Sequence, residues 1–197
     1  MPDRILLYIS AAPDLALERE TLSKAAIEIP TSLAWRIKQT PGPGEKLDSE
    51  TAARADVHVL IMGSDIRAPV GVEWLAARRA GRTPTPFLKE GVRHTPAASV
   101  FIRDLEQHAA WHPYADAADL RGQVLKLLLE HILDRTDYYR IAPEEFQKLR
   151  AFQKHLDKAD KKLIDQTRGG AGASSVILSA ERFTPSEGKL VHPKKSK

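Results

Sequence analysis

The chain has 197 residues, of which 42% are hydrophobic and 28% charged, as in soluble globular proteins, and this length suits one α/β domain with about 50 residues to spare. It contains no cysteine, which excludes disulfides and thiolate metal sites and fits a cytoplasmic protein, and no apolar segment approaches the roughly 18 residues that a membrane helix needs. The net charge of +4 arises largely in the tail, where four lysines from Lys189 to Lys197 face only Glu187.

The first forty residues predict a strand, a helix and a second strand. Ile5–Ile9 is an unbroken apolar run that Ser10 ends, and Asp14 is a suitable N-cap for the helix that follows. The apolar face of that helix comprises Leu15, Leu22, Ala25, Ala26 and Ile29. Ser32–Lys38 alternates between apolar and polar residues, which predicts a half-exposed edge strand.

The centre of the chain predicts a buried strand that runs into a helix. After a short helix at Leu47–Ala55, capped by Asp48 or Ser49, the apolar run Val57–Met62 is typical of a strand covered on both faces. A polar turn, Gly63-Ser64-Asp65, leads to a helical pattern from about Pro69 to Gly81. One face of this helix carries Val72, Leu75, Ala76 and Ala80.

The next segments continue the alternation of strands and helices. They are a strand at Thr83–Lys89, a helix at Pro96–His108, a short strand at Trp111–Tyr114 and an amphipathic helix at Ala117–Asp134. Such alternation predicts parallel strands joined by right-handed crossovers. We therefore expect residues 1–140 to form an α/β domain, a flavodoxin-like open parallel sheet of about five strands with helices on both faces.

A helical extension and a tail follow this domain. Residues 141–168 predict an amphipathic helix, starting at Pro143, whose apolar seam consists of Leu149, Phe152, Leu156, Ala159, Leu163 and Gln166. The seam can pack on its own domain or bind another chain, and both alternatives stay open. Residues 169–197 read as a flexible tail, in which Val176, Ile177 and Leu178 form a short β-prone segment that can add to a partner.

Two carboxylates form the candidate catalytic site. Asp65 and Glu73 follow the central strand, and the carboxyl edge of a parallel sheet is where ligands bind. Ser10, Ser64 and Trp74 are candidates for binding a substrate there. Each residue also has a structural interpretation, because Asp65 can close its own turn, Glu73 can favour the helix dipole and Trp74 can pack in the core.

Several kinds of site are excluded by motif. The sequence has no P-loop, no GxGxxG and no GxSxG, which disfavours a nucleoside triphosphatase or a serine hydrolase. Its seven histidines are scattered without the spacing of metal ligands on a helix. We expect no metal and no bound cofactor.

The segment Leu15-Ala16-Leu17-Glu18-Arg19-Glu20-Thr21-Leu22, together with Phe101–Leu105, Trp111 and Asp119–Leu133, resembles a bacterial TIR-like family of unknown function. The resemblance covers about residues 4–134 and is one of pattern. It implies a flavodoxin-like domain of the kind found at the front of STAND-type signalling ATPases and other bacterial conflict systems.

A second resemblance concerns the central helix. Gly63-Ser64-Asp65 followed by Gly71–Ala76 is similar to the pattern of nucleoside deoxyribosyltransferases, and NAD-cleaving TIR domains place a glutamate comparably. This implies that Glu73 acts on a sugar carbon as the base leaves, where a nearby anion stabilises an oxocarbenium-like centre. The chain departs from these families after the first strand, where Ser10 stands alone before Ala11 and Ala12 and no glycine-containing turn follows.

Three functional hypotheses follow. The first is a TIR-like signalling or effector domain of a bacterial defence complex that acts mainly through protein–protein interaction or homo-oligomerisation, with its C-terminal helix and tail as the docking segment. The second is an enzyme that breaks the N-glycosidic bond of NAD or a nucleoside through Glu73. The third and weakest is nucleic-acid binding through the basic tail.

Overall fold

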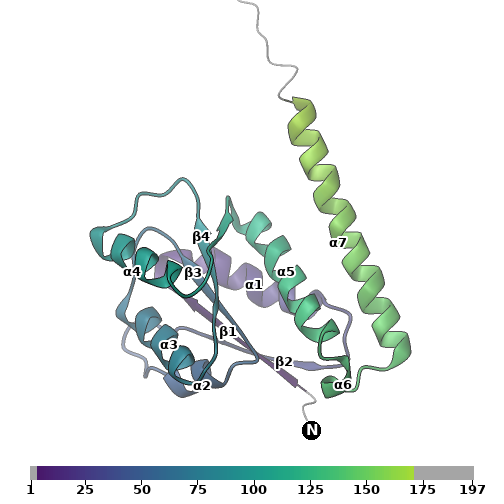
Figure 1. The fold of residues 1–197 in the computed structure, drawn as a ribbon, viewed down its shortest axis with the longest axis horizontal. Coiled ribbons are helices and arrows are strands. Elements are labelled where there is room, and N and C mark those ends of the chain that lie inside the picture. The colour runs from purple at the N-terminus through teal and green to yellow at the C-terminus, as the bar shows by residue number, and fades with distance from the viewer. Residues whose placement is uncertain (1–3, 171–197) are drawn as a thin grey trace, which may run out of the picture. The chain divides into compact units, whose positions relative to one another are not determined.

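The structure is a computed structural model that describes residues 4–170, with side chains described for residues 4–159 (Figure 1). Its centre is a five-stranded sheet in the order β2-β1-β3-β4-β5. The strands are β1 (Arg4–Ala11), β2 (Ala34–Gln39), β3 (Val57–Met62), β4 (Thr85–Lys89) and β5 (His112–Tyr114). Every neighbouring pair is parallel, so the predicted flavodoxin-like α/β fold is confirmed.

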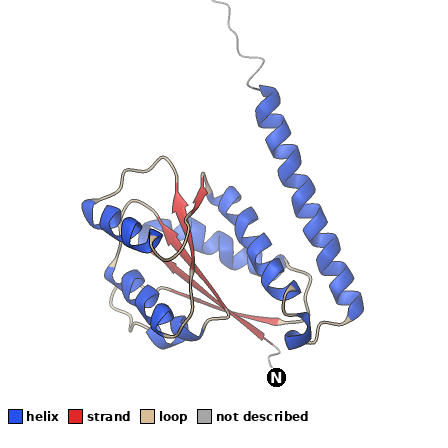
Figure 2. Cartoon of the chain, viewed as in Figure 1, coloured by secondary structure: helices blue, strands red, loops and turns tan. Residues whose placement is uncertain are grey.

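The connections between the strands are helical (Figure 2). The α-helices are α1 (Ala16–Glu28), α2 (Ser49–Arg54), α3 (Ala68–Arg79), α4 (Pro96–Glu106), α5 (Ala117–Leu133), α6 (Thr136–Tyr139) and α7 (Pro143–Gly170). A 3-10 turn, η1 (Pro13–Leu15), precedes α1. Three of the helices begin at side-chain caps that accept backbone N–H groups, namely Asp48 for α2, Thr95 for α4 and Asp116 for α5.

The strand positions follow from how much of each strand is covered. All six residues of β3 are buried, as expected for the central strand of a sheet with helices on both faces. In β2, exposed and half-buried residues alternate, which confirms the predicted edge strand. Its partly buried Trp35 and Ile37 pack against the core.

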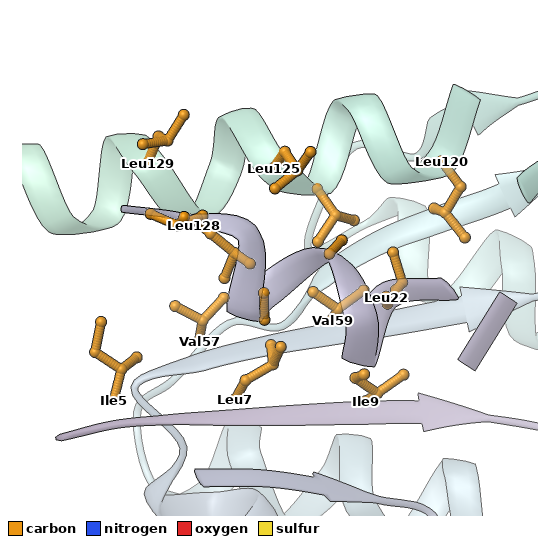
Figure 3. Close-up of a cluster of buried hydrophobic side chains, with 14 of the residues drawn as sticks. Ile5, Leu7, Ile9, Leu22, Val57, Val59, Leu120, Leu125, Leu128 and Leu129 are labelled. Atoms are coloured by element: carbon orange, nitrogen blue, oxygen red, sulfur yellow. The ribbon is translucent and has the colours of Figure 1, made fainter. Parts of the chain in front are cut away.

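The larger core lies on the face of the sheet covered by α1 and α5 (Figure 3). The odd-numbered residues of β1 and β3 point into it, because successive side chains of a strand face opposite sides. Residues from four elements meet there: Ile5, Leu7, Ile9, Leu22, Val57, Val59, Leu120, Leu125, Leu128 and Leu129.

The other face of the sheet is covered by α2, α3 and α4. Tyr8 packs with Ala52 of α2 and with Ala55, which directly follows this helix, and Leu60 packs with residues of α3 and α4. This face also holds polar side chains of β1 and β3, because Ser10 and His58 are buried on it.

Helix α3 is turned opposite to its sequence pattern. Its buried residues are Val70, Glu73, Trp74 and Ala77. Val72 and Leu75, from the apolar face recognised in the sequence, are 42% and 50% exposed. The helix therefore presents a carboxylate to the sheet and two aliphatic side chains to solvent.

The first half of α7 packs on the domain that precedes it. Leu149 is fully buried in the larger core, and Phe152 and Leu156 are partly buried against it. Glu145 fixes the start of the helix by accepting hydrogen bonds from Thr31 Oγ1 (2.7 Å) and from the backbone N–H of Ser32 (2.6 Å). The compact unit to which these residues belong ends at Asp160.

Candidate functional site

Glu73, the predicted catalytic residue, lies beneath the surface. Its exposed fraction is 0%, and both carboxylate oxygens accept hydrogen bonds from hydroxyl groups. Tyr8 Oη donates to Oε1 at 2.7 Å, and Ser10 Oγ and Thr40 Oγ1 donate to Oε2 at 2.6 and 2.7 Å. The expectation that Glu73 stands at the open rim of the sheet is therefore wrong.

Two strands supply the three hydroxyl groups. Tyr8 and Ser10 are alternate residues of β1, so both point to the face that α3 covers. Thr40 directly follows β2, and its own hydroxyl oxygen accepts the backbone N–H of Ala11 at 3.1 Å. The Glu73 carboxylate thus ties α3 to the carboxyl ends of β1 and β2.

His58 of β3 extends this network. Its Nε2 lies 2.8 Å from Ser10 Oγ, and its ring meets the Tyr8 ring edge-on at 5.2 Å between centroids. Because Ser10 has a single hydroxyl hydrogen and donates it to Glu73, it must accept from His58, which places the imidazole proton on Nε2. His58 Nδ1 is buried and has no hydrogen-bond partner among the described residues.

Burial dominates the electrostatics of this cluster. It raises the pKa of Glu73 above its ordinary value, and the hydrogen bonds from Ser10, Thr40 and Tyr8 oppose that rise. Burial also lowers the pKa of His58 to about 3, so this ring is neutral at physiological pH. The pKa of Tyr8 is raised by burial and by the charge of Glu73.

The chemistry open to the cluster follows from the order of its groups. Ser10 lies between the imidazole and the carboxylate, whereas a nucleophilic serine is activated by a histidine that lies between it and the acid. Thr40 is held in place as well, since its carbonyl accepts from Arg19 at 2.8 Å and its N–H donates to Ile9 O at 3.0 Å. Packed side chains therefore separate Glu73 from solvent in this structure.

The second predicted acid belongs to a different network. Asp65 Oδ1 accepts from Thr95 Oγ1 at 2.6 Å and from the backbone N–H of Ile66 at 2.9 Å. The Thr95 hydrogen bond lowers the pKa of Asp65. The Ser64 carbonyl accepts the Thr95 N–H at 2.9 Å, and the Ser64 hydroxyl lies 3.4 Å from Asp14 Oδ2. Asp65 and Ser64 thus connect the loop after β3 to the cap of α4, and neither contacts Glu73.

The remaining predicted substrate-binding residues are part of the packed interior. Trp74 is 2% exposed and packs with Leu60, Val70 and Leu105, so it is not available to stack on a base. Ser10 is fully buried beside Glu73. The crevice between the ends of β1 and β3 is also close-packed, because a Cβ placed on Gly63 would lie 3.1 Å from Leu15 Cδ2.

The predicted partner-binding residues have separate outcomes. Leu149 is in the core of the domain, so its assignment to a partner is wrong, and Phe152 and Leu156 pack beside it with part of their surface exposed. The side chain of Leu163 is not among those described, and Val176, Ile177 and Leu178 lie outside the described residues.

Sequence reasoning missed Tyr8, Thr40 and His58. The available signal was the polar side chains at alternate positions of β1, Tyr8 and Ser10, and a histidine inside the apolar run of β3. These polar positions indicate a polar partner on the covering helix, and Glu73 is that partner.

Two further findings concern the described part of the chain. No group of three or more histidine or acidic side chains there is arranged to hold a metal ion. None of its helices is long and apolar enough to cross a bilayer.

Comparison of the chain with family models, with curated proteins and with solved structures finds no match.

Proposed function

We propose that the chain is a TIR-like signalling module that acts through protein–protein interaction, with the outer face of α3 as its docking surface. The observation that carries this proposal is the orientation of α3, which buries Glu73 and exposes Val72 and Leu75. The flavodoxin-like sheet and the sequence resemblance support the TIR-like part of the proposal.

The exposed side chains of α3 are suited to docking. Val72 and Leu75 are three residues apart, so they are neighbours on one side of the helix. Single exposed apolar residues are ordinary on protein surfaces, but an amphipathic helix normally directs such pairs to the core. A partner that covers Val72 and Leu75 would remove apolar surface that the fold leaves in water.

Light scattering across a range of protein concentrations tests this docking surface, with a second copy of the chain as the partner. We expect the full chain to self-associate and the double variant Val72→Lys/Leu75→Lys to remain monomeric at the same concentrations. Val100→Lys is the matched control, because Val100 is 58% exposed on α4 and lies outside the proposed surface. A wild-type chain that is monomeric throughout, or equal loss of association in both variants, would refute the assignment of this surface.

The second candidate is cleavage of the N-glycosidic bond of NAD or a nucleoside by Glu73. The observation that favours it is a carboxyl group of raised pKa beside Ser10 at the end of β1, since such a group can protonate a leaving base. It requires that the packing around Glu73 opens, because this side chain is fully buried. Chromatography of NAD or nucleosides incubated with the full chain distinguishes the two candidates. Free base released by the wild type and not by Glu73→Gln would replace the interaction proposal with this one.

The nucleic-acid hypothesis depends on the basic tail, which lies outside the described residues. It predicts binding that weakens steeply as salt concentration rises. Binding that is unaffected by salt, or retained after removal of residues 169–197, would contradict it.

A further inference from the structure

A basic cavity of about 310 Å³ lies at the amino ends of β3 and β4, and Glu73 is not among the residues that line it. Asp56 directly precedes β3, and Arg82 lies three residues before β4. The other lining residues come from the end of α5, from Arg135 in the link to α6, and from α6, elements that can be followed in Figure 1. The complete lining is Asp56, Arg82, His131, Arg135, Tyr138 and Tyr139.

Two guanidinium groups give the cavity its positive charge. Arg82 donates one N–H to the Ala55 carbonyl at 2.7 Å, and Arg135 donates one N–H to His131 Nδ1 at 3.2 Å. Within the described part of the chain neither forms an ion pair, and their other N–H groups have no protein acceptor. The opposing charge is Asp56, whose Oδ2 accepts the Leu6 N–H at 2.8 Å.

The hydrogen bonds of His131 leave the Tyr139 hydroxyl available as a donor, in addition to the two guanidinium groups. An arginine can only donate, so His131 Nδ1 must be the acceptor and the ring proton is on Nε2. Nε2 lies 2.8 Å from Tyr139 Oη and therefore donates to it. The hydroxyl hydrogen of Tyr139 then has no acceptor among the described residues. A pKa of about 4 for His131, lowered by burial and by Arg135, agrees with this neutral ring.

Tyr138 and the turn that follows complete the cavity. The Tyr138 side chain is 59% exposed, and its ring meets the Tyr139 ring edge-on at 5.1 Å between centroids. Arg140, the next residue, is the one non-glycine residue with positive φ (53°) in the described part of the chain. This turn, held by N–H bonds from Arg140 to α6 carbonyls, positions both tyrosines at the cavity.

We propose that this cavity binds a phosphate group, with Arg82, Arg135 and the Tyr139 hydroxyl as donors. Guanidinium groups match the geometry of phosphate oxygens, and charge-assisted hydrogen bonds are the strong ones. The volume is at the small end of ligand sites and suits a phosphate or a small phosphate monoester. Asp56 is the one acid among the described residues of the lining, and a sugar hydroxyl of a monoester supplies a hydrogen-bond donor for it. The proposal is independent of the function proposed for α3.

Titration calorimetry of the full chain with inorganic phosphate, ribose 5-phosphate and ribose tests the site. We expect both phosphates to bind at millimolar concentration or below and ribose not to bind. Tighter binding of ribose 5-phosphate identifies a monoester as the ligand, and equal binding identifies free phosphate. Absence of heat with both phosphates overturns the proposal.

Variants locate the binding. Arg82→Gln and Arg135→Gln should each weaken phosphate binding by about tenfold or more, because each removes a charged donor. Arg103→Gln is the matched control, since Arg103 is an exposed arginine that also donates one N–H to a backbone carbonyl, that of Ser99 at 3.3 Å. Thermal unfolding by circular dichroism verifies that each variant is folded. Unchanged binding in both cavity variants, or an equal loss in Arg103→Gln, shows that phosphate does not bind in this cavity.

Discussion

At the scale of single residues, three hydroxyl donors replace the water that would otherwise solvate the Glu73 carboxylate. The stability of a Glu73 variant therefore depends on whether the new side chain still bonds to these hydroxyls. In Glu73→Gln the amide oxygen can accept from Ser10 and Thr40 while the amide nitrogen donates to Tyr8 Oη. We expect this variant to change the free energy of unfolding at pH 7 by less than about 1.5 kcal/mol. Glu73→Ala leaves the three hydroxyls without an acceptor and should lower it by about 3 kcal/mol or more, as measured by urea denaturation.

The pH dependence of the same variant tests the ionisation of Glu73. The pKa is raised in the folded protein, so the folded state binds the carboxyl proton more tightly than the unfolded chain, where the ordinary value is 4.5. The resulting stabilisation is complete below pH 4.5 and is lost as pH rises towards the folded pKa. Glutamine has no carboxyl proton to release, so the free energy of unfolding of Glu73→Gln should rise relative to that of wild type as pH rises above 4.5. A constant difference between the two proteins would contradict a raised pKa.

Burial of Glu73 shows where sequence reasoning reached its limit for the site. The residue was identified from its place after the central strand, and that place is correct. Its direction was not predicted, because Val72 and Leu75 also form an apolar face of the helix and a carboxylate is rarely buried without a partner. Two of its partners are Ser10 and Thr40, 63 and 33 residues away in the chain. Polar residues inside a strand indicate that a polar partner exists, but they do not identify which residue it is.

At the scale of elements, the first turns of α7 belong to the domain. Leu149→Ala should lower the free energy of unfolding by about 2–5 kcal/mol, because it leaves a cavity in the larger core. Leu156→Ala should cost less, since Leu156 is only partly buried. Denaturant unfolding measures both. As a control, removal of residues 161–197 should leave the stability unchanged, because the compact unit ends at residue 160. Equal losses from Leu149→Ala and Leu156→Ala would show that α7 does not pack as described.

Sequence patterns predicted most of the elements to within a few residues. The five strands and the face of α1 that carries Leu22 and Ala25 could be predicted because apolar periodicity records burial directly. Helix α6 was missed because one turn of helix is too short to show a period. The alternative left open for the seam of α7 could not be decided either, since an apolar stripe has the same pattern whether its own domain or another chain covers it.

At the scale of the whole molecule, the stability of the fold depends on acid through two histidines, the buried His58 and the partly buried His131. Burial lowers the pKa of His58 to about 3 and that of His131 to about 4, while both would titrate near 6.5 in the unfolded chain. Their contribution is therefore complete above pH 6.5 and is lost as pH falls towards 3. We expect the free energy of unfolding to fall over this range and to fall less steeply in His58→Phe/His131→Phe. His155→Phe is the control, because His155 is exposed on α7. The same slope in all three proteins would show that neither ring resists protonation.

The overall architecture was the most predictable property of the chain. The parallel order follows from strands that alternate with helices and from a central run, Val57–Met62, that is apolar on both faces. Function was less predictable, because a flavodoxin-like sheet hosts many activities and the deciding features are side-chain directions. The basic cavity illustrates this, since Asp56, Arg82 and Arg135 are widely separated in the chain and show no motif.

The roll of α3 about its own axis has a consequence for how this sequence selects one packing. The observed orientation buries Val70 and Trp74 together with Glu73, and the competing one would bury Val72 and Leu75, so the three hydroxyls that donate to Glu73 add a polar preference for the observed angle. The Glu73 carboxylate thus helps to fix the angle at which the helix lies on the sheet. Replacing Glu73 and its three hydroxyl partners by well-fitting aliphatic groups should leave a protein that resists denaturant but holds this helix less strictly at one angle.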